Sequence, residues 1–317
     1  MAQKDPDPLF ILRASSPITS LSFSFLNSVE VLITGSQNGL IEVWNLSTKR
    51  TMLHVLTDAH EILYANIIHS EDFYLVGHNR SGLVQFFKIE DSKFCLQHSL
   101  LVHNVGFASI NFLKEKDVFW LAYPSSDSEV SVTTVDFNVT TGNYGVIYTM
   151  KPDIKVGMVM KCILFIRDCI LYLICAYEDG SVCLWNVFES SMLHREKVYE
   201  DPVMSMDTDG RKIITASTGN KIHFYNIDEN FHLIQINEYE TMSSGYSVLS
   251  IRSDKKIVAC GSWNGVVRLY SWKKMKLLAI LKYHNKGISS IVYSSGNIIG
   301  IAARDGKISI WDVYKNT

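Results

Sequence analysis

A short sequence phrase recurs along this 317-residue chain. Each copy opens on a turn pair such as Asn-Gly or Asp-Gly, continues with alternating apolar residues, and ends in an aromatic and a polar residue. The clearest copies are residues 37–45, 178–186 and 304–312. With weaker copies, seven anchor positions fall at residues 44, 87, 133, 185, 225, 270 and 311, about 44 residues apart. Such a period indicates one small supersecondary unit for each repeat.

Each repeat also contains the other strands that a four-stranded blade needs. A short apolar strand ending in small residues precedes the anchor, as in residues 31–36, 257–262 and 298–303. An alternating segment precedes that strand, as in residues 18–23 and 288–293. No stretch has sustained helical periodicity, so we predict an all-β fold, a seven-bladed β-propeller.

The two ends of the sequence are complementary. Only four residues follow Val313, so the last repeat lacks its fourth strand, whereas a spare apolar strand lies at residues 8–14. We expect this strand to complete the last blade and protect its edge. We therefore predict one propeller domain over residues 1–317, with an irregular loop at about 138–160, where the anchor spacing is largest.

Composition narrows the functional classes. Lys and Arg number 30 against 32 Asp and Glu, and this balance argues against a nucleic-acid or anionic-membrane surface. The six cysteines form no C-x-x-C pair, which favours reduced thiols. No secretory signal or membrane-length apolar run is visible, so we expect an intracellular protein.

The Trp-Asn and Trp-Asp endings, the Asp-Gly turns and the period resemble those of the WD40-repeat family. A narrower resemblance is to the family of guanine nucleotide-binding protein subunit beta-like protein 1, whose fungal counterpart is ASTRA-associated protein 1. It is carried by residues 7–13, 36–40, 104–107, 155–160 and 176–182. Residues 155–160 (Lys-Val-Gly-Met-Val-Met) are the most diagnostic, because generic WD40 repeats lack them.

This resemblance implies a non-enzymatic adaptor. Members of that family associate with the TTT co-chaperone complex, which helps PI3-kinase-related protein kinases to mature, and in fungi with the chromatin-linked ASTRA assembly. We expect a monomer within a larger complex, with other proteins as partners and without direct nucleic-acid or membrane binding. A G-protein gamma subunit is not expected as a partner, because the first strand begins by Leu9 and leaves no room for the helix that binds gamma.

Several residues are predicted to be structural. Trp44, Trp185 and Trp311 are expected to pack between blades. In the last repeat His284 and Asp305 join Trp311, with Ala303 in place of the usual Ser or Thr. A Ser-His-Asp hydrolase is the alternative, but it needs a serine in a strained turn and the chain has no G-x-S-x-G. We predict no catalytic residues, no cofactor and no metal site.

The residues just before each turn pair are predicted to ring the channel mouth and bind partners. In this register they are Gln37, Arg80, Glu178, Thr218, Trp263 and Arg304, with Tyr177 extending the same patch. Trp263 has no strand neighbours to bury it, and an exposed tryptophan is a favoured interface anchor. Lys155, Met158 and Met160 form a second candidate contact, although residues 156–162 also fit the first strand of the fourth blade.

These features leave two functional hypotheses. The first is a co-chaperone adaptor with a large contact surface. The alternative is a peptide-reading module, either a ubiquitin-ligase substrate receptor or a histone reader. The basic cluster at residues 273–276 is interpreted as a solvated turn rather than a nucleic-acid contact.

Overall fold

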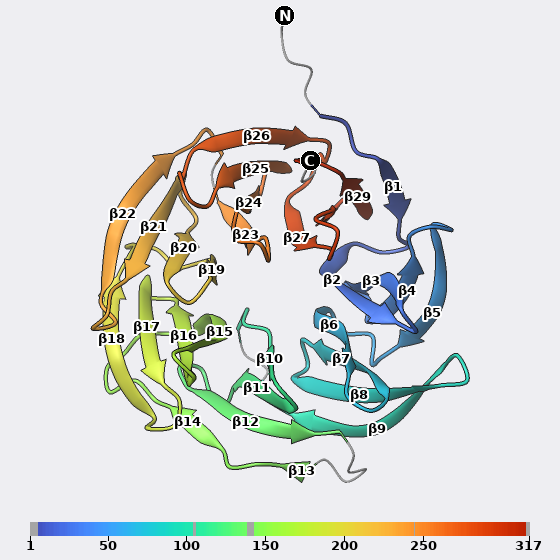
Figure 1. The fold of residues 1–317 in the computed structure, drawn as a ribbon, viewed down its shortest axis with the longest axis horizontal. Coiled ribbons are helices and arrows are strands. Elements are labelled where there is room, and N and C mark those ends of the chain that lie inside the picture. Colours follow the sequence, from blue (N-terminus) through green and yellow to red (C-terminus); the bar gives the residue numbers. More distant parts are fainter. Residues whose placement is uncertain (1–5, 104–105, 138–142, 244, 315–317) are drawn as a thin grey trace, which may run out of the picture. The chain divides into compact units, whose positions relative to one another are not determined.

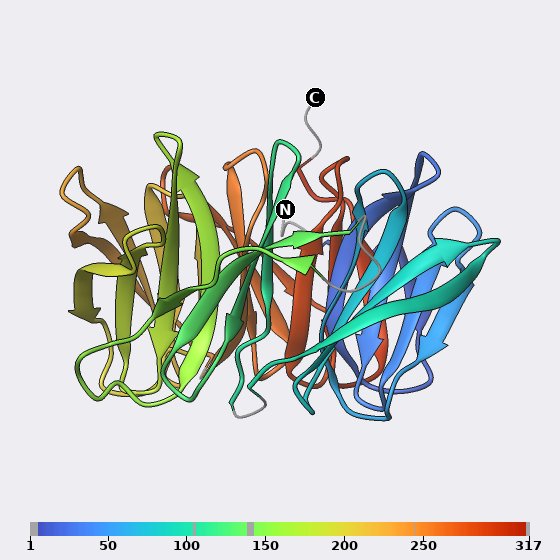
Figure 2. The same ribbon diagram turned by 90° about the horizontal axis from the view of Figure 1, so that it is seen from below.

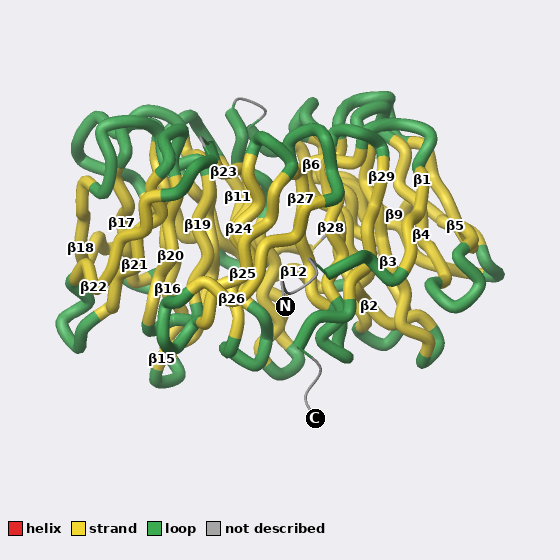
Figure 3. Tube along the Cα trace, turned by 90° about the horizontal axis from the view of Figure 1, so that it is seen from above, coloured by secondary structure: helices red, strands yellow, loops and turns green. Residues whose placement is uncertain are grey.

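The computed structural model of this chain describes residues 6–103, 106–137, 143–243 and 245–314. Within these residues 29 β-strands form seven sheets, each of them a blade of the β-propeller fold (Figure 3). The predicted all-β, seven-bladed fold is therefore confirmed. The described ranges contain no helix of the length and apolarity needed to cross a membrane.

Tertiary contacts divide the chain into two compact units. Unit 1 consists of Met1–Asn79, Phe86–Leu96 and Tyr246–Thr317. Unit 2 consists of Arg80–Gln85 and Gln97–Gly245. The existence of a single domain over residues 1–317 stays a prediction.

Three sheets lie in unit 1. The first has the order β2 (Ile18–Leu26), β3 (Val29–Ser36), β4 (Leu40–Asn45), β5 (Arg50–Leu56). The second has the order β23 (Tyr246–Ile251), β24 (Ile257–Ser262), β25 (Val266–Ser271), β26 (Leu277–Lys282). The third has the order β1 (Phe10–Arg13), β29 (Lys307–Trp311), β28 (Ile299–Ala303), β27 (Ile288–Tyr293). Within each sheet the strands run side by side and are joined at their ends by loops (Figure 2).

Unit 2 also contains three sheets. One has β10 (Asn111–Glu115), β11 (Val118–Pro124) and β12 (Val130–Asp136), with the short β13 (Asn143–Tyr144) and β14 (Tyr148–Met150) both paired to β12. The next has β15 (Val159–Arg167), β16 (Ile170–Tyr177), β17 (Ser181–Asn186) and β18 (Ser191–Lys197). The last has β19 (Ser205–Thr208), β20 (Lys212–Ala216), β21 (Lys221–Ile227) and β22 (Leu233–Glu240).

In the remaining sheet the chain passes from one unit to the other. Its strands are β6 (Ile62–His69), β7 (Phe73–Asn79), β8 (Leu83–Glu90) and β9 (Lys93–Leu101).

The segment predicted as an irregular loop begins outside the described residues, which omit 138–142. Its described part holds β13 and β14, two short strands in the position where other sheets have one outer strand. Residues 151–158 then lead into β15, which begins at Val159.

The N-terminal strand completes the last sheet, as predicted. β1 pairs with β29 in antiparallel register from Phe10 opposite Ile310 to Arg13 opposite Lys307 (Figure 1). Leu12, in the middle of this strand, is buried against the sheet. The pairing gives β29 a partner on both sides, so the third strand of this sheet is not left as an open edge.

Small residues and hydroxyls join neighbouring sheets within unit 1. A Cβ on Gly261 would lie 2.6 Å from Cγ2 of Ile288, so only glycine lets β27 approach this closely. The hydroxyls of Ser22 and Ser24 on β2 each donate to a carbonyl of β6, both at 2.7 Å. These bonds bridge inner strands that no backbone ladder connects, and they satisfy polar atoms in the core.

The aromatic anchors lie in the core, as their positions predicted. Trp185 and Trp311 are 2% and 1% exposed, and Trp44 is 8% exposed. Trp185 packs in one cluster with Leu164, Cys175 and other side chains of unit 2.

This burial gives a stability prediction. Trp185→Ala is expected to lower the free energy of unfolding by about 3–5 kcal/mol, because it leaves a large cavity. Urea denaturation measures the loss. Trp263→Ala is the control, since Trp263 is 44% exposed, and its effect is expected to stay within about 0.5 kcal/mol. Equal losses for the two variants would contradict the assignment.

Candidate protein-interaction surfaces

A rigid turn links the second and third strands of the first sheet and exposes one residue. The Ser36 hydroxyl lies 2.7 Å from Oδ1 of Asn38 and 2.8 Å from the Leu40 carbonyl. Gly39 has a φ of +82°, and a Cβ there would lie 2.8 Å from the backbone of Ala59. The side chain of Gln37 is exposed at the start of this fixed turn.

The turn that carries Trp263 is built in the same way. The Ser262 hydroxyl lies 2.6 Å from Oδ1 of Asn264. The Trp263 backbone packs on Gly287, whose Cβ would lie 3.0 Å from the Trp263 carbonyl oxygen. The Arg304 amide donates to the Gly287 carbonyl at 3.0 Å. Trp263 and Arg304, both exposed, thus share one backbone support. Gln37, Trp263 and Arg304 are called the unit 1 turn residues below.

In unit 2 the predicted mouth residue Glu178 holds the predicted loop. The Met158 amide donates to Oε2 of Glu178 at 3.1 Å, and the Glu178 amide donates to the Met158 carbonyl at 2.9 Å. Gly157 lies beneath this carboxylate with a φ of +74°, and a Cβ there would lie 2.7 Å from Oε2 of Glu178. The two candidate contacts therefore form one structure, which presents Lys155 as an exposed side chain.

Arg80 belongs to the same part of unit 2. Its Nη1 donates to the Gly106 carbonyl at 3.2 Å, and its guanidinium lies 5.8 Å from the centre of the Phe107 ring. Phe107 is 56% exposed. A Cβ on Gly106 would lie 3.5 Å from the Val159 carbonyl, next to Met158. The unit 2 loop surface consists of residues Arg80, Phe107, Lys155, Met158 and Glu178.

Sequence reasoning missed Phe107 as a surface residue. An aromatic residue directly after a glycine in a loop is a signal that could have indicated an exposed side chain. We relied on the alternation of apolar residues in strands, and Phe107 lies outside any such pattern. Thr218, by contrast, was predicted and is half-buried, with its hydroxyl donating to Oδ2 of Asp201 at 3.1 Å.

Two predicted contact residues are corrected by their burial. Tyr177 ends β16 with its side chain 0% exposed, in the cluster that contains Cys175 and Trp185. Met160 is 6% exposed and falls at a β-bulge, where the register between β15 and β16 shifts between Val159 and Lys161. Neither side chain offers a surface to a partner, so both predictions are wrong.

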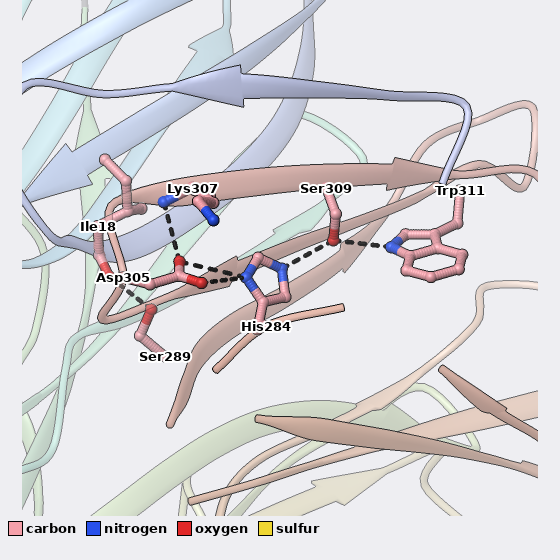
Figure 4. Close-up of polar contacts among 7 residues, drawn as sticks. All are labelled: Ile18, His284, Ser289, Asp305, Lys307, Ser309 and Trp311. Atoms are coloured by element: carbon pink, nitrogen blue, oxygen red, sulfur yellow. Dashed lines mark hydrogen bonds and ion pairs between the residues drawn. The ribbon is translucent and has the colours of Figure 1, made fainter. Parts of the chain in front are cut away.

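The last sheet contains a buried hydrogen-bond chain (Figure 4). Nδ1 of His284 lies 3.1 Å from Oδ2 of Asp305, and its Nε2 lies 2.8 Å from Oγ of Ser309. The indole N–H of Trp311 donates to the same Ser309 oxygen at 2.7 Å. With the ring proton on Nδ1, the Ser309 hydroxyl donates to Nε2, and every group in the chain is satisfied.

Ser309 corrects the prediction made for Ala303. Thr34, which accepts from the Trp44 indole at 3.2 Å, lies opposite the residue two positions before that tryptophan. In the last sheet the corresponding residue is Ile301, which lies opposite Ser309. The hydroxyl that accepts from the tryptophan therefore lies on the second strand in the first sheet and on the third strand in the last sheet.

The fourth repeat has lost this hydrogen-bond chain. The positions that correspond to Ile301 and Ser309 are Cys175 and Cys183, which lie opposite each other. The Trp185 indole nitrogen is buried, and no described residue places an acceptor at hydrogen-bond distance from it. The turn aspartate of this repeat, Asp179, pairs with Arg195 at 2.7 Å, whereas the corresponding Asp305 of the last repeat bonds to His284.

Burial makes the Ser309–His284–Asp305 array structural. Ser309 is 0% exposed and its oxygen already accepts from Trp311, so it is closed to a substrate. Among the described residues no group of three or more His, Cys, Asp or Glu side chains is placed to hold a metal ion.

The fold and its turns define the class of protein. The family model for the WD domain, G-beta repeat, matches residues 6–45 and 275–312, the first and last repeats. With the seven sheets, these matches show a seven-bladed β-propeller that contains WD40 repeats.

Individual relatives match nearly the whole chain. Mouse guanine nucleotide-binding protein subunit beta-like protein 1 is 28% identical over 321 residues, covering 98% of this chain and 97% of that protein. ASTRA-associated protein 1 of Schizosaccharomyces japonicus is 26% identical, covering 98% of this chain and 99% of that protein. The protein of the same name from Schizosaccharomyces pombe is 25% identical with the same coverage.

The hydrogen-bond chain gives a second stability prediction. Ser309→Ala removes a donor from His284 and an acceptor from Trp311, and we expect a loss of about 1–3 kcal/mol in the free energy of unfolding. Ser295→Ala is the control, because Ser295 is exposed and its bond to Glu30 uses the backbone amide. Urea denaturation measures the free energy of unfolding of both variants. If Ser309→Ala loses no more stability than Ser295→Ala, the structural role of Ser309 is refuted.

The same chain predicts a pH dependence. Burial lowers the pKa of His284 and outweighs the attraction of Asp305. The unfolded chain therefore takes up the proton first as the pH falls below the unfolded pKa of about 6.5, and stability decreases. Melting curves between about pH 8 and 5 should show a smaller loss for His284→Gln than for wild type. Parallel losses would contradict the assignment.

Proposed function

We propose that this chain is a non-enzymatic adaptor that acts with the TTT co-chaperone complex in the maturation and stability of PI3-kinase-related protein kinases. It works in cytoplasm and nucleus as a monomer within a larger complex, and its proposed partners include ASTRA subunits. Support comes from the coverage of relatives named ASTRA-associated protein 1, which match 98% of this chain. WD40 propellers generally serve as non-enzymatic protein-interaction scaffolds.

The observation that carries this proposal is the rigid display of exposed side chains on fixed turns. Trp263 is 44% exposed although its backbone is packed on Gly287. Phe107 is 56% exposed beside Arg80, whose guanidinium is held by a backbone carbonyl. Aromatic and arginine side chains are the usual energetic centres of interfaces, and fixed turns lose little conformational entropy on binding.

The test is affinity purification of the tagged chain from its native cell, followed by quantitative mass spectrometry. Wild type is expected to recover TTT subunits and PI3-kinase-related kinases. Trp263→Ala and Phe107→Ala are each expected to reduce this recovery about tenfold, the effect of losing an interface anchor. Ser295→Ala should leave it unchanged.

Three results would overturn the proposal. The first is an absence of TTT subunits from the wild-type eluate. The second is full recovery by both aromatic variants. The third is tight binding of a single short modified peptide that needs Trp263, which would favour a peptide-reading module instead.

A further inference from the structure

The near-neutral net charge hides a strongly basic segment. Residues 255–304 contain nine of the chain's 30 Lys and Arg residues and no Asp or Glu. The rest of the chain carries the other 21 basic residues together with all 32 acidic ones. This segment contains β24 to β28 of unit 1. A segment with this excess of positive charge favours contact with an acidic partner.

The lysines gather at one end of the sheet β23–β26. Lys255 and Lys256 lie in the hairpin before β24, and the Lys256 carbonyl accepts from the Trp272 amide at 2.8 Å. This bond brings the first hairpin against the next one, which carries lysines 273, 274 and 276. These five lysines, all exposed, are called the basic end.

The acidic residue nearest to the basic end in sequence is already engaged. Oδ1 and Oδ2 of Asp254 accept from Nε and Nη2 of Arg252 at 2.9 and 2.8 Å. Arg252 is 2% exposed, so this carboxylate is held by a buried partner. Oδ2 of Asp254 lies 3.9 Å from Nζ of Lys256, a longer separation than its contact with Arg252.

The outer strand that begins at the basic end is an apolar edge. β26 is the last strand of its sheet, and no described strand pairs with its outer side (Figure 1). Its first five residues, 277–281, are Leu-Leu-Ala-Ile-Leu, and Leu277 and Leu278 are 47% and 39% exposed. Natural sheets usually place charges on such edges, as Glu238 and Glu240 do on the outer strand β22.

The side chain of Tyr314 contacts this edge. The Tyr314 hydroxyl donates to the Leu278 carbonyl at 2.7 Å, and Tyr314 is itself 46% exposed. A single exposed hydroxyl caps one carbonyl and leaves the leucine side chains uncovered. An extended strand adds to an edge of this kind through backbone hydrogen bonds, with side-chain contacts giving specificity.

We propose that β26 is a docking edge for an extended acidic segment of a partner protein. The segment adds as a further strand, its apolar side chains cover Leu277 and Leu278, and its carboxylates meet the basic end. This edge is separate from the unit 1 turn residues and the unit 2 loop surface, so the inference goes beyond the proposed function.

Two other occupants fit less well. A second copy of this chain, paired antiparallel through Ala279, would place Lys276 of each copy opposite Lys282 of the other, and like charges directly opposite are destabilising. Nucleic acid would use the lysines through its phosphates but would leave the strand edge and its leucines uncovered.

The test uses a blocked, fluorescein-labelled peptide of alternating valine and glutamate. We expect it to bind the full chain, to slow hydrogen exchange of the amides in residues 277–282, and to bind more weakly as salt is raised. A matched peptide with lysine in place of glutamate, and one with a central proline, are expected not to bind, since they lack the charge or the continuous backbone pairing.

Variants locate the site. Combined Lys273→Glu, Lys274→Glu and Lys276→Glu should raise the Kd about tenfold or more, as loss of charge complementarity predicts. Leu278→Asn should also raise the Kd, because it removes the apolar contact at the edge without adding a charge that attracts or repels the peptide. Met52→Asn on the outer strand β5 is the matched control, because Met52 is 48% exposed, and should bind like wild type. Melting curves confirm that each variant is folded.

The outcomes separate the occupants. The proposal is overturned if the glutamate peptide leaves exchange in β26 unchanged, or if either the triple Lys→Glu variant or Leu278→Asn binds it normally. Slowed exchange in β26 with rising protein concentration would indicate self-pairing. Oligonucleotide binding that needs the same lysines, without peptide binding, would indicate nucleic acid. Trp263→Ala should bind the peptide normally, so this test fails or succeeds independently of the proposed function.

Discussion

The tight turn between the second and third strands of a repeat is the constraint on which the rest depends. Its glycine has a φ of +84° at Gly180 and +83° at Gly265, a conformation that other residues rarely adopt. The turn fixes the register of the two strands, and the register places the tryptophan anchors in the core. The same turn leaves its first residue exposed, as Glu178 and Trp263 show. The same turn geometry therefore buries the tryptophan anchors and exposes the first residue of the turn to solvent.

This geometry explains the most diagnostic stretch of the sequence, residues 155–160, in physical terms. Val156 is fully buried, Gly157 lies beneath the Glu178 carboxylate, and Met160 is buried at a bulge. Most of the stretch thus serves to hold the loop on the Glu178 turn. The side chains that this stretch leaves accessible are the exposed Lys155 and the half-buried Met158. The motif is therefore mainly structural: it fixes the position of the unit 2 loop surface.

The sequence predicted the blades and anchors because strand alternation and turn pairs are local signals, repeated seven times. It failed where the outcome depends on contacts between distant segments. Alternation did not show that Tyr177 ends its strand facing the core. Ser309 joins the His284 network because it lies opposite Ile301 on the neighbouring strand. From the sequence we assigned this position to Ala303, two residues further along, and so did not find Ser309. Phe107 lies in a loop without periodicity, and its exposure depends on Gly106 and Arg80.

The central claim is that fixed turns hold the partner-binding side chains. Hydrogen–deuterium exchange of the full chain, alone and with purified TTT complex, tests it most directly. The account predicts slower exchange with the complex at the turns around Trp263 and Arg304 and at residues 154–158. Unchanged exchange at all of these turns, with a complex that is shown to bind, would contradict it.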